Sequence, residues 1–256
     1  MPDITISLML CCAVAFFVAG FVDSIAGGGG LITMPSLLIA GLPPHYALGT
    51  GKLASSLGAL TARFTFARSK LIDMRIVPMG FAAAFIGSAF GSWVALQIDS
   101  ALLGKILIVL LPVGLLMSLL CGGVKLSSGE LPAKGLMWRL WLIGFTIGAY
   151  DGFFGPGAGS FFMIGLHVLL NMGLVKASGN AKVLNLASNV GALCAFASGG
   201  VVLYSLAIPC AIASILGNRL GAKYAIQIGP KFVRNMLYVS ISLLFATLVY
   251  RFFIAA

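Results

Sequence analysis

The same arrangement of residues occurs twice in this chain, about half a chain apart. An aspartate, Asp23 or Asp151, is followed by a cluster of glycines, an apolar stretch and then a lysine, Lys52 or Lys182. A fold that accommodates both copies must have two related halves. It must also bring glycine-broken apolar segments together with a small number of charged side chains.

Charged residues are rare elsewhere. Only 9% of the 256 residues are charged and 60% are hydrophobic. A soluble domain is usually about one quarter charged. The composition therefore predicts an all-α polytopic membrane protein. The formal net charge of +10 comes from basic residues between apolar segments. There they set topology and meet lipid head groups, so the expected macromolecular surroundings are membrane lipid and not nucleic acid.

The apolar segments predict a helical hairpin and three transmembrane helices in each half. The first apolar run, from about Ile4 to Gly41, is too long for one span of about 20 residues, and glycines 27–30 break it. We predict an arm to Val22, a bend and a short arm over 31–40. Helices should follow at 47–67, 76–97 and 102–121.

The second half repeats this plan after a polar segment. Residues 122–139 are predicted to be a cytoplasmic linker between an N-terminal repeat, 1–121, and a C-terminal repeat, 140–256. The second half should contain an arm near 140–153, a break at 155–159, a short arm to about Leu170, and helices near 175–197, 202–226 and 232–254.

Loop charges predict that the two repeats have inverted topology. The loop after the Lys52 helix carries Arg68, Lys70 and Arg75, whereas its counterpart at 198–205 carries no charge. The following loops reverse this difference. By the positive-inside rule, equivalent loops then lie on opposite faces of the membrane. Inverted repeats require each half to cross the membrane an odd number of times. Three helices with a two-armed hairpin meet this condition, which favours a hairpin at each glycine break. With the linker in the cytoplasm, both termini are expected outside.

Lys52 and Lys182 each lie near the start of an apolar stretch. A lysine there is costly unless it snorkels to the interface or meets a negative charge. Because snorkelling explains one such lysine better than two at equivalent positions, we favour binding of a small anionic substrate. Structural pairing with Asp23 and Asp151 is the alternative.

The glycine breaks favour the same chemistry. A bend exposes backbone N–H groups, and a helix that begins there directs its positive dipole end at the break, so oxyanions can bind. Close helix packing is the alternative, and we prefer it for Gly87, Gly91, Gly217 and Gly221. The glycines predicted to contact substrate are Gly27, Gly28, Gly29, Gly30, Gly155, Gly157 and Gly159.

The two aspartates stand next to these breaks. In a medium of low dielectric constant, Asp23 and Asp151 could exchange a coupling proton. Equally, they could accept N–H bonds from the hairpin or pair with the lysines. Further polar residues near the lysines are candidate substrate ligands: Thr50, Ser55, Asn180, Asn185 and Asn189.

Enzyme chemistry is not indicated. The five cysteines and the two histidines lack metal-ligand spacing, so no metal or other cofactor is expected. Neither glycine cluster fits the phosphate-binding motif of nucleotide-binding proteins, and no catalytic triad is apparent.

Two motifs resemble a known family. Segment 23–31 reads Asp-Ser-Ile-Ala-Gly-Gly-Gly-Gly-Leu and segment 150–160 reads Tyr-Asp-Gly-Phe-Phe-Gly-Pro-Gly-Ala-Gly-Ser. In combination they resemble the TauE/SafE (TSUP, sulfite exporter) family of membrane permeases, and within it the YfcA-like branch. The resemblance covers essentially the whole chain. It implies a multi-pass protein of a bacterial-type inner membrane that moves small sulfur-containing anions: sulfite, sulfoacetate or related sulfonates.

One departure from the family pattern concerns the first lysine helix. Relatives often read Thr-Asn-Lys where this chain reads Thr50-Gly51-Lys52, whereas Asn180 and Asn185 remain in the second half. The resemblance therefore implies two similar halves that are not equivalent, and a shift in substrate preference.

The sequence thus predicts a secondary transporter of a small anion that works by alternating access, with Lys52 and Lys182 at its site and proton coupling as a further hypothesis. A passive anion channel and a non-transporting membrane subunit are the alternatives. A homo-oligomer is compatible with the sequence.

Overall fold

The computed structural model describes residues 5–107, 135–229 and 235, and the described chain is helical, without strands. It forms the following helices: α1 (Ile6–Ala26), α2 (Gly30–Ile39), α3 (Pro44–Arg68), α4 (Val77–Leu96), α6 (Leu136–Phe153), α7 (Ala158–Leu170), α8 (Leu174–Ser198) and α9 (Tyr204–Ile228). Residues 100–107 are also helical. The rest of the helix expected at 102–121, most of the linker and the helix expected at 232–254 lie outside the described residues.

Both glycine clusters interrupt helices, as predicted. α1 ends where Gly27 adopts a φ of +80° and its N–H donates to the carbonyl oxygen of Asp23. α2 starts three residues later, and α6 and α7 are separated in the same way by Gly155 and Gly157, at φ values of +93° and +84°. Positive φ favours glycine, which has no Cβ to clash with its own backbone.

Two predicted boundaries are wrong. α1 continues to Ala26 instead of ending near Val22, because Ser24, Ile25 and Ala26 are buried in the bundle and Gly27 provides the C-cap. Asp23 therefore lies in the last turn of α1 and not beyond it. α6 begins at Leu136, so the last residues of the predicted linker, 136–139, are helical.

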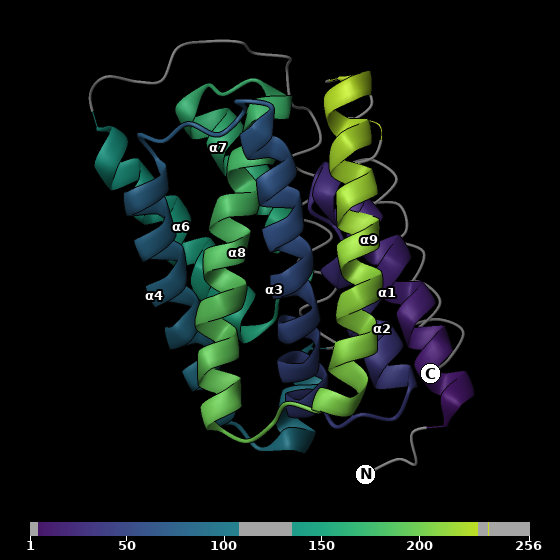
Figure 1. The fold of residues 1–256 in the computed structure, drawn as a ribbon. Helices are drawn as coiled ribbons and strands as arrows, with labels where there is room; N and C mark the ends of the chain where they lie inside the picture. The colour runs from purple at the N-terminus through teal and green to yellow at the C-terminus, as the bar shows by residue number, and fades with distance from the viewer. Residues whose placement is uncertain (1–4, 108–134, 230–234, 236–256) are drawn as a thin grey trace.

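The helices pair between the halves. In Figure 1, α3 and α8 lie side by side at the centre, with α4 and α6 on one side and α1 and α9 on the other. α4 packs most extensively on α6 and α1 on α9, while α3 contacts both α8 and α9. The connection between α3 and α4 lies at the top of the view, and the connection between α8 and α9 at the bottom.

Small residues allow the outer helices to approach closely. A Cβ atom added at Gly87 or Gly91 would overlap the backbone of α6, and one added at Gly217 or Gly221 would overlap that of α1. This is the small-residue packing common between membrane helices, and it confirms the predicted role of these four glycines.

The outer helices have the composition of membrane spans. α1, α4 and α9 are long and apolar enough to cross a membrane. Large apolar side chains are exposed along one face of α9, where Ile208, Ile212 and Leu216 follow one another at helical spacing. Such a face suits lipid. The two buried lysines lie on the central helices, Lys52 on α3 and Lys182 on α8.

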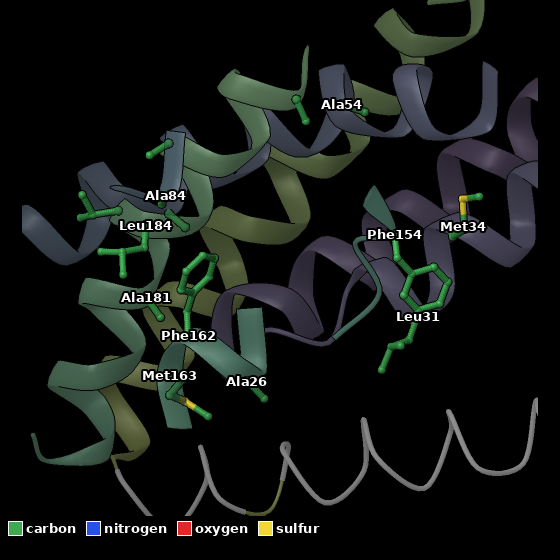
Figure 2. Packing of buried hydrophobic residues seen from close by; sticks show 14 of the residues in the cluster. Ala26, Leu31, Met34, Ala54, Ala84, Phe154, Phe162, Met163, Ala181 and Leu184 are labelled. Carbon is green, nitrogen blue, oxygen red and sulfur yellow. The ribbon is translucent and has the colours of Figure 1, made fainter. Parts of the chain in front are cut away.

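Apolar contacts surround the two breaks. Figure 2 shows Phe154, which follows α6, beside Leu31 and Met34 of α2. On the other side, Phe162 and Met163 of α7 lie near α8, in the same buried cluster as Leu184. The ends of the hairpins are thus held in place by side chains from both halves.

Candidate functional site

The two lysines are paired crosswise between the halves. Lys52 Nζ of α3 lies 2.7 Å from Asp151 Oδ1 of α6, and Lys182 Nζ of α8 lies 2.6 Å from Asp23 Oδ2 of α1. The lysines are only 6% and 1% exposed. Removing one partner from such a buried pair is strongly destabilising, because the other charge is left without compensation. The pairing that the sequence suggested as an alternative therefore exists, and it links each half to the other.

The two acids differ in their remaining partners. The backbone N–H of Gly29 donates to Asp23 Oδ1 over 3.3 Å, so Asp23 bonds the start of its own hairpin bend. Asp151 Oδ2 accepts a hydrogen bond from the Ser188 hydroxyl of α8. The two lysines are 130 positions apart in the sequence, and the same separation relates Ser188 of α8 to Gly58 of α3. Among the described residues, the carboxylate of one pair, Asp151, thus accepts a hydrogen bond from a hydroxyl group, and that of Asp23 does not.

The two hairpin bends touch each other. The backbone N–H of Ser160 donates to the Gly27 carbonyl oxygen over 3.1 Å, and its hydroxyl donates to the Ala26 carbonyl oxygen over 2.6 Å. A Cβ atom added at Gly27 would overlap the backbone of Gly159 and Ser160. Close packing and positive φ therefore both account for Gly27, although the sequence analysis favoured ligand contact for it.

A cavity of about 60 Å³ lies beside this contact. Its wall is formed by both bends and by parts of α1, α2, α3, α6, α7, α8 and α9. One part is apolar and contains Met34, Leu37, Leu48 and Phe154. The polar part of the wall contains Asp23, Lys52, Ser55, Asp151, Asn185, Asn189, Ser214 and Asn218.

Most of the predicted site residues line this cavity. They are Lys52, Asp23, Asp151, Ser55, Asn185, Asn189, Gly27, Gly29, Gly30, Gly155 and Gly159. Those outside its lining are Lys182, Gly28, Gly157, Thr50 and Asn180. The lysines, equivalent in sequence, are therefore not equivalent in space, since one lines the cavity and the other is enclosed by protein.

Thr50 and Asn180 hold loops of the opposite half. Thr50 Oγ1 accepts from the N–H of Leu203 before α9, over 3.1 Å. Asn180 Oδ1 accepts from the N–H of Asp73 before α4, over 2.9 Å, and its Nδ2 donates to Leu71 O over 3.1 Å. In that loop, hydrogen bonds from Arg75 hold the pKa of the Asp73 carboxyl below its ordinary value.

Four polar residues near the site were not predicted: Thr33, Ser188, Ser214 and Asn218. Thr33 belongs to α2 and lines the cavity. Ser188 contacts Asp151, and Ser214 and Asn218 of α9 line the cavity. Ser214 and Asn218 are four residues apart and therefore share one face of α9. The sequence could have indicated Ser214 and Asn218, because two polar residues on one face of an apolar span are rare unless they have a role.

The family follows from the whole chain. The sequence profile described as "Sulfite exporter TauE/SafE" matches residues 12–248. The chain belongs to this family. A probable membrane transporter protein, ORF9, from a Sinorhizobium species is 38% identical over 93% of this chain and 91% of its own length. A probable membrane transporter protein of Haemophilus influenzae is 38% identical over 97% of both chains. No solved structure matches this chain significantly.

A third relative supports the predicted branch. The probable membrane transporter protein YfcA of Escherichia coli K12 is 37% identical over 93% of this chain and 89% of its own length. The resemblance to the TauE/SafE family and its YfcA-like members is thereby confirmed. This TauE/SafE protein is a helical membrane protein of a transporter family, and neither the family nor its relatives' names indicate an enzyme.

Proposed function

We propose that this TauE/SafE protein is a secondary transporter of a small anion, with sulfite and short organosulfonates as its substrate class. We further propose that it crosses the inner membrane several times. The observation that carries the proposal is the position of Lys52. This buried cation lines a central cavity, beside both hairpin bends, and is bound to a carboxylate of the other half.

The cavity suits a ligand of a few heavy atoms. One water molecule needs roughly 15 Å³ of such a cavity, so a cavity of about 60 Å³ holds about four water molecules. α2 begins at Gly30 in the cavity wall and has no side-chain cap at its first turn. The N–H groups of Gly29, Leu31 and Ile32 at this end already have hydrogen-bond partners, so it is the positive end of the α2 dipole that would favour an anion and supplement the charge of Lys52.

A proton would accompany the anion. The two pairs carry two positive and two negative charges, so an added anion would leave an uncompensated charge in a medium of low dielectric constant. We propose that Lys52 Nζ leaves Asp151 Oδ1 for the anion while Asp151 takes up a proton from solution. We favour Asp151 over Asp23 as the coupling acid, because the partner of Asp23, Lys182, does not line the cavity.

Alternating access is the proposed mechanism. The positions of the α3–α4 and α8–α9 loops at opposite ends of the bundle support two inverted-topology repeats. The crosswise ion pairs support the same relation, since each repeats the other with the halves exchanged. The charges of Arg68, Lys70 and Arg75 favour a cytoplasmic location for the α3–α4 loop. Rocking of one repeat against the other would then expose a fixed site to each side in turn.

Flux in proteoliposomes tests the proposal. We expect purified protein to accumulate sulfite or ethanesulfonate against its gradient when the opposite compartment is made acidic, and Asp151→Asn to remove the pH drive. Sulfate and thiosulfate serve as comparison anions of different shape. Flux that only dissipates gradients would indicate a passive channel instead. Folded protein without any flux would indicate a non-transporting membrane subunit.

A further inference from the structure

We propose that Asn218 makes this site select anions that carry a hydrogen-bond donor of their own, separate from the charged group. The inference rests on the proposed function and deepens it. It predicts that a hydroxylated or aminated short sulfonate is preferred over the plain alkyl sulfonate of the same length.

The amide oxygen of Asn218 has no hydrogen-bond partner in the part of the chain that the structure describes. Asn218 is 2% exposed and lines the cavity, and its Oδ1 is buried without a donor among the described residues. A buried polar atom in this state is uncommon in folded proteins. Its cost disappears when a ligand supplies the missing N–H or O–H group.

The orientation of the amide is fixed by its own helix. Nδ2 donates to the Ser214 carbonyl oxygen over 3.0 Å and lies 3.3 Å from the Ser214 hydroxyl oxygen. Rotating the amide by half a turn would bring Oδ1 against the carbonyl oxygen, and two acceptors would then face each other. Oδ1 is therefore the atom that remains available.

Neighbouring helices hold this side chain in place. A Cβ atom added at Gly20 of α1 would lie 2.8 Å from Asn218 Nδ2, and one added at Gly58 of α3 would overlap the same nitrogen. The amide is thus enclosed by two helices that have no side chain at these positions. It cannot swing away to find another donor without leaving this space.

The position of the amide sets the kind of ligand. Lys52, Ser55 and Gly58 follow one another on α3 at intervals of three residues. Lys52 and Gly58 are separated by about 9 Å along the helix axis, at 1.5 Å per residue. A donor at Asn218 therefore belongs to a different group from the oxyanion at Lys52. A hydroxyl or amino group on a short carbon chain meets this condition.

The other half contains no such free acceptor at the matching place. The separation of 130 positions that relates the two lysines also relates Asn218 to Ser88 of α4. The Ser88 hydroxyl donates to the Ser188 carbonyl oxygen over 2.6 Å. The unpaired group thus lies on the side of the bundle where the cavity is, as expected if it serves a ligand.

Competition between two matched sulfonates tests the inference. Ethanesulfonate and 2-hydroxyethanesulfonate have the same charge and chain length and differ by one hydroxyl group. In wild-type protein, we expect the hydroxylated anion to bind roughly 5- to 150-fold more tightly, as expected from the cost of leaving a buried acceptor unpaired. Equal affinities would overturn the inference, because a water molecule would then satisfy Oδ1. This measurement requires no variant.

The substitution Asn218→Leu adds a second criterion. Leucine has a similar size and no acceptor, so the variant should bind 2-hydroxyethanesulfonate no more tightly than ethanesulfonate, because the hydroxyl group would then be buried without a partner. A preference that survives in the variant would also overturn the inference. If wild-type protein binds neither sulfonate, sulfite nor any other anion of the panel, the proposed function fails and the inference fails with it. Equal binding overturns the inference alone.

Discussion

Lys52 and Asp151 join the two halves of the chain through an ion pair of 2.7 Å in the wall of the central cavity. The reciprocal pair of Lys182 and Asp23 is as short, at 2.6 Å, but its lysine is enclosed by protein. The two pairs should therefore contribute similarly to folding and differently to ligand binding. Substitutions that preserve the shape of each pair can separate these roles.

The double variant Lys52→Gln with Asp151→Asn should fold and lose anion binding. Replacing both charges leaves no unpaired buried ion, and the two amides can still hydrogen-bond each other. Without Lys52, however, the described residues provide no positive side chain in the cavity wall. We expect the affinity for sulfite or ethanesulfonate to fall at least tenfold, as measured by ligand-dependent thermal stabilisation in detergent.

The matched control is the double variant Lys182→Gln with Asp23→Asn. It makes the same chemical change at the corresponding place in the bundle. Because Lys182 lies outside the cavity lining, the affinity should fall by less than tenfold. Equal losses in the two double variants would contradict the assignment of Lys52 as the lysine that binds the anion.

The single variant Lys52→Gln should be less stable than the double variant. It leaves the Asp151 carboxylate buried, at 2% exposure, without the positive charge that compensates it. Breaking one side of a buried pair costs about 3–5 kcal/mol. Adding Asp151→Asn should restore most of this loss, which unfolding measurements on the purified variants can detect. Additive destabilisation would mean that the two residues do not interact.

The sequence was sufficient to locate the breaks and the charged residues. Gly27 and Gly157 interrupt helices because a glycine tolerates positive φ, a property that can be recognised from residue type. Gly27 also leaves room for the backbone of the other bend. Asp23, Asp151 and Lys52 stood out because charge is rare in apolar segments. The family was predicted on the same motifs.

The crosswise pairing could not be predicted, because it depends on how the halves dock. Lys52 is closer in sequence to Asp23, yet it binds Asp151. The roles of Thr50 and Asn180 were hidden for the same reason, since their partners Leu203 and Asp73 belong to loops of the opposite half. Sequence spacing within one half contains no information about such contacts.

The contact between the bends should be intolerant of a single methyl group. Gly27→Ala would place a Cβ atom in the backbone of Gly159 and would also strain a residue with a φ of +80°. We expect a large loss of folded, monodisperse protein. Gly200→Ala is the matched control, since Gly200 has a φ of +68° but nothing within 4 Å of an added Cβ. It should cost about 1–2 kcal/mol from backbone strain alone. Similar losses in both variants would show that packing of the bends is unimportant.

Gly51 should control the size of anion that the cavity accepts. It lies in the cavity wall, and an added Cβ would meet only Leu37 Cδ1, at 3.5 Å. Gly51→Ala should therefore fold well, because alanine is the better helix former. Gly51→Leu should fill part of the cavity and weaken ethanesulfonate binding more than sulfite binding, by about tenfold. Gly49→Ala on the same helix is the control, because its Cβ would overlap the Val201 carbonyl oxygen outside the cavity lining. This control should lower the melting temperature without changing the ratio of the two affinities. Unchanged binding of both anions by Gly51→Leu would exclude this cavity as the substrate site.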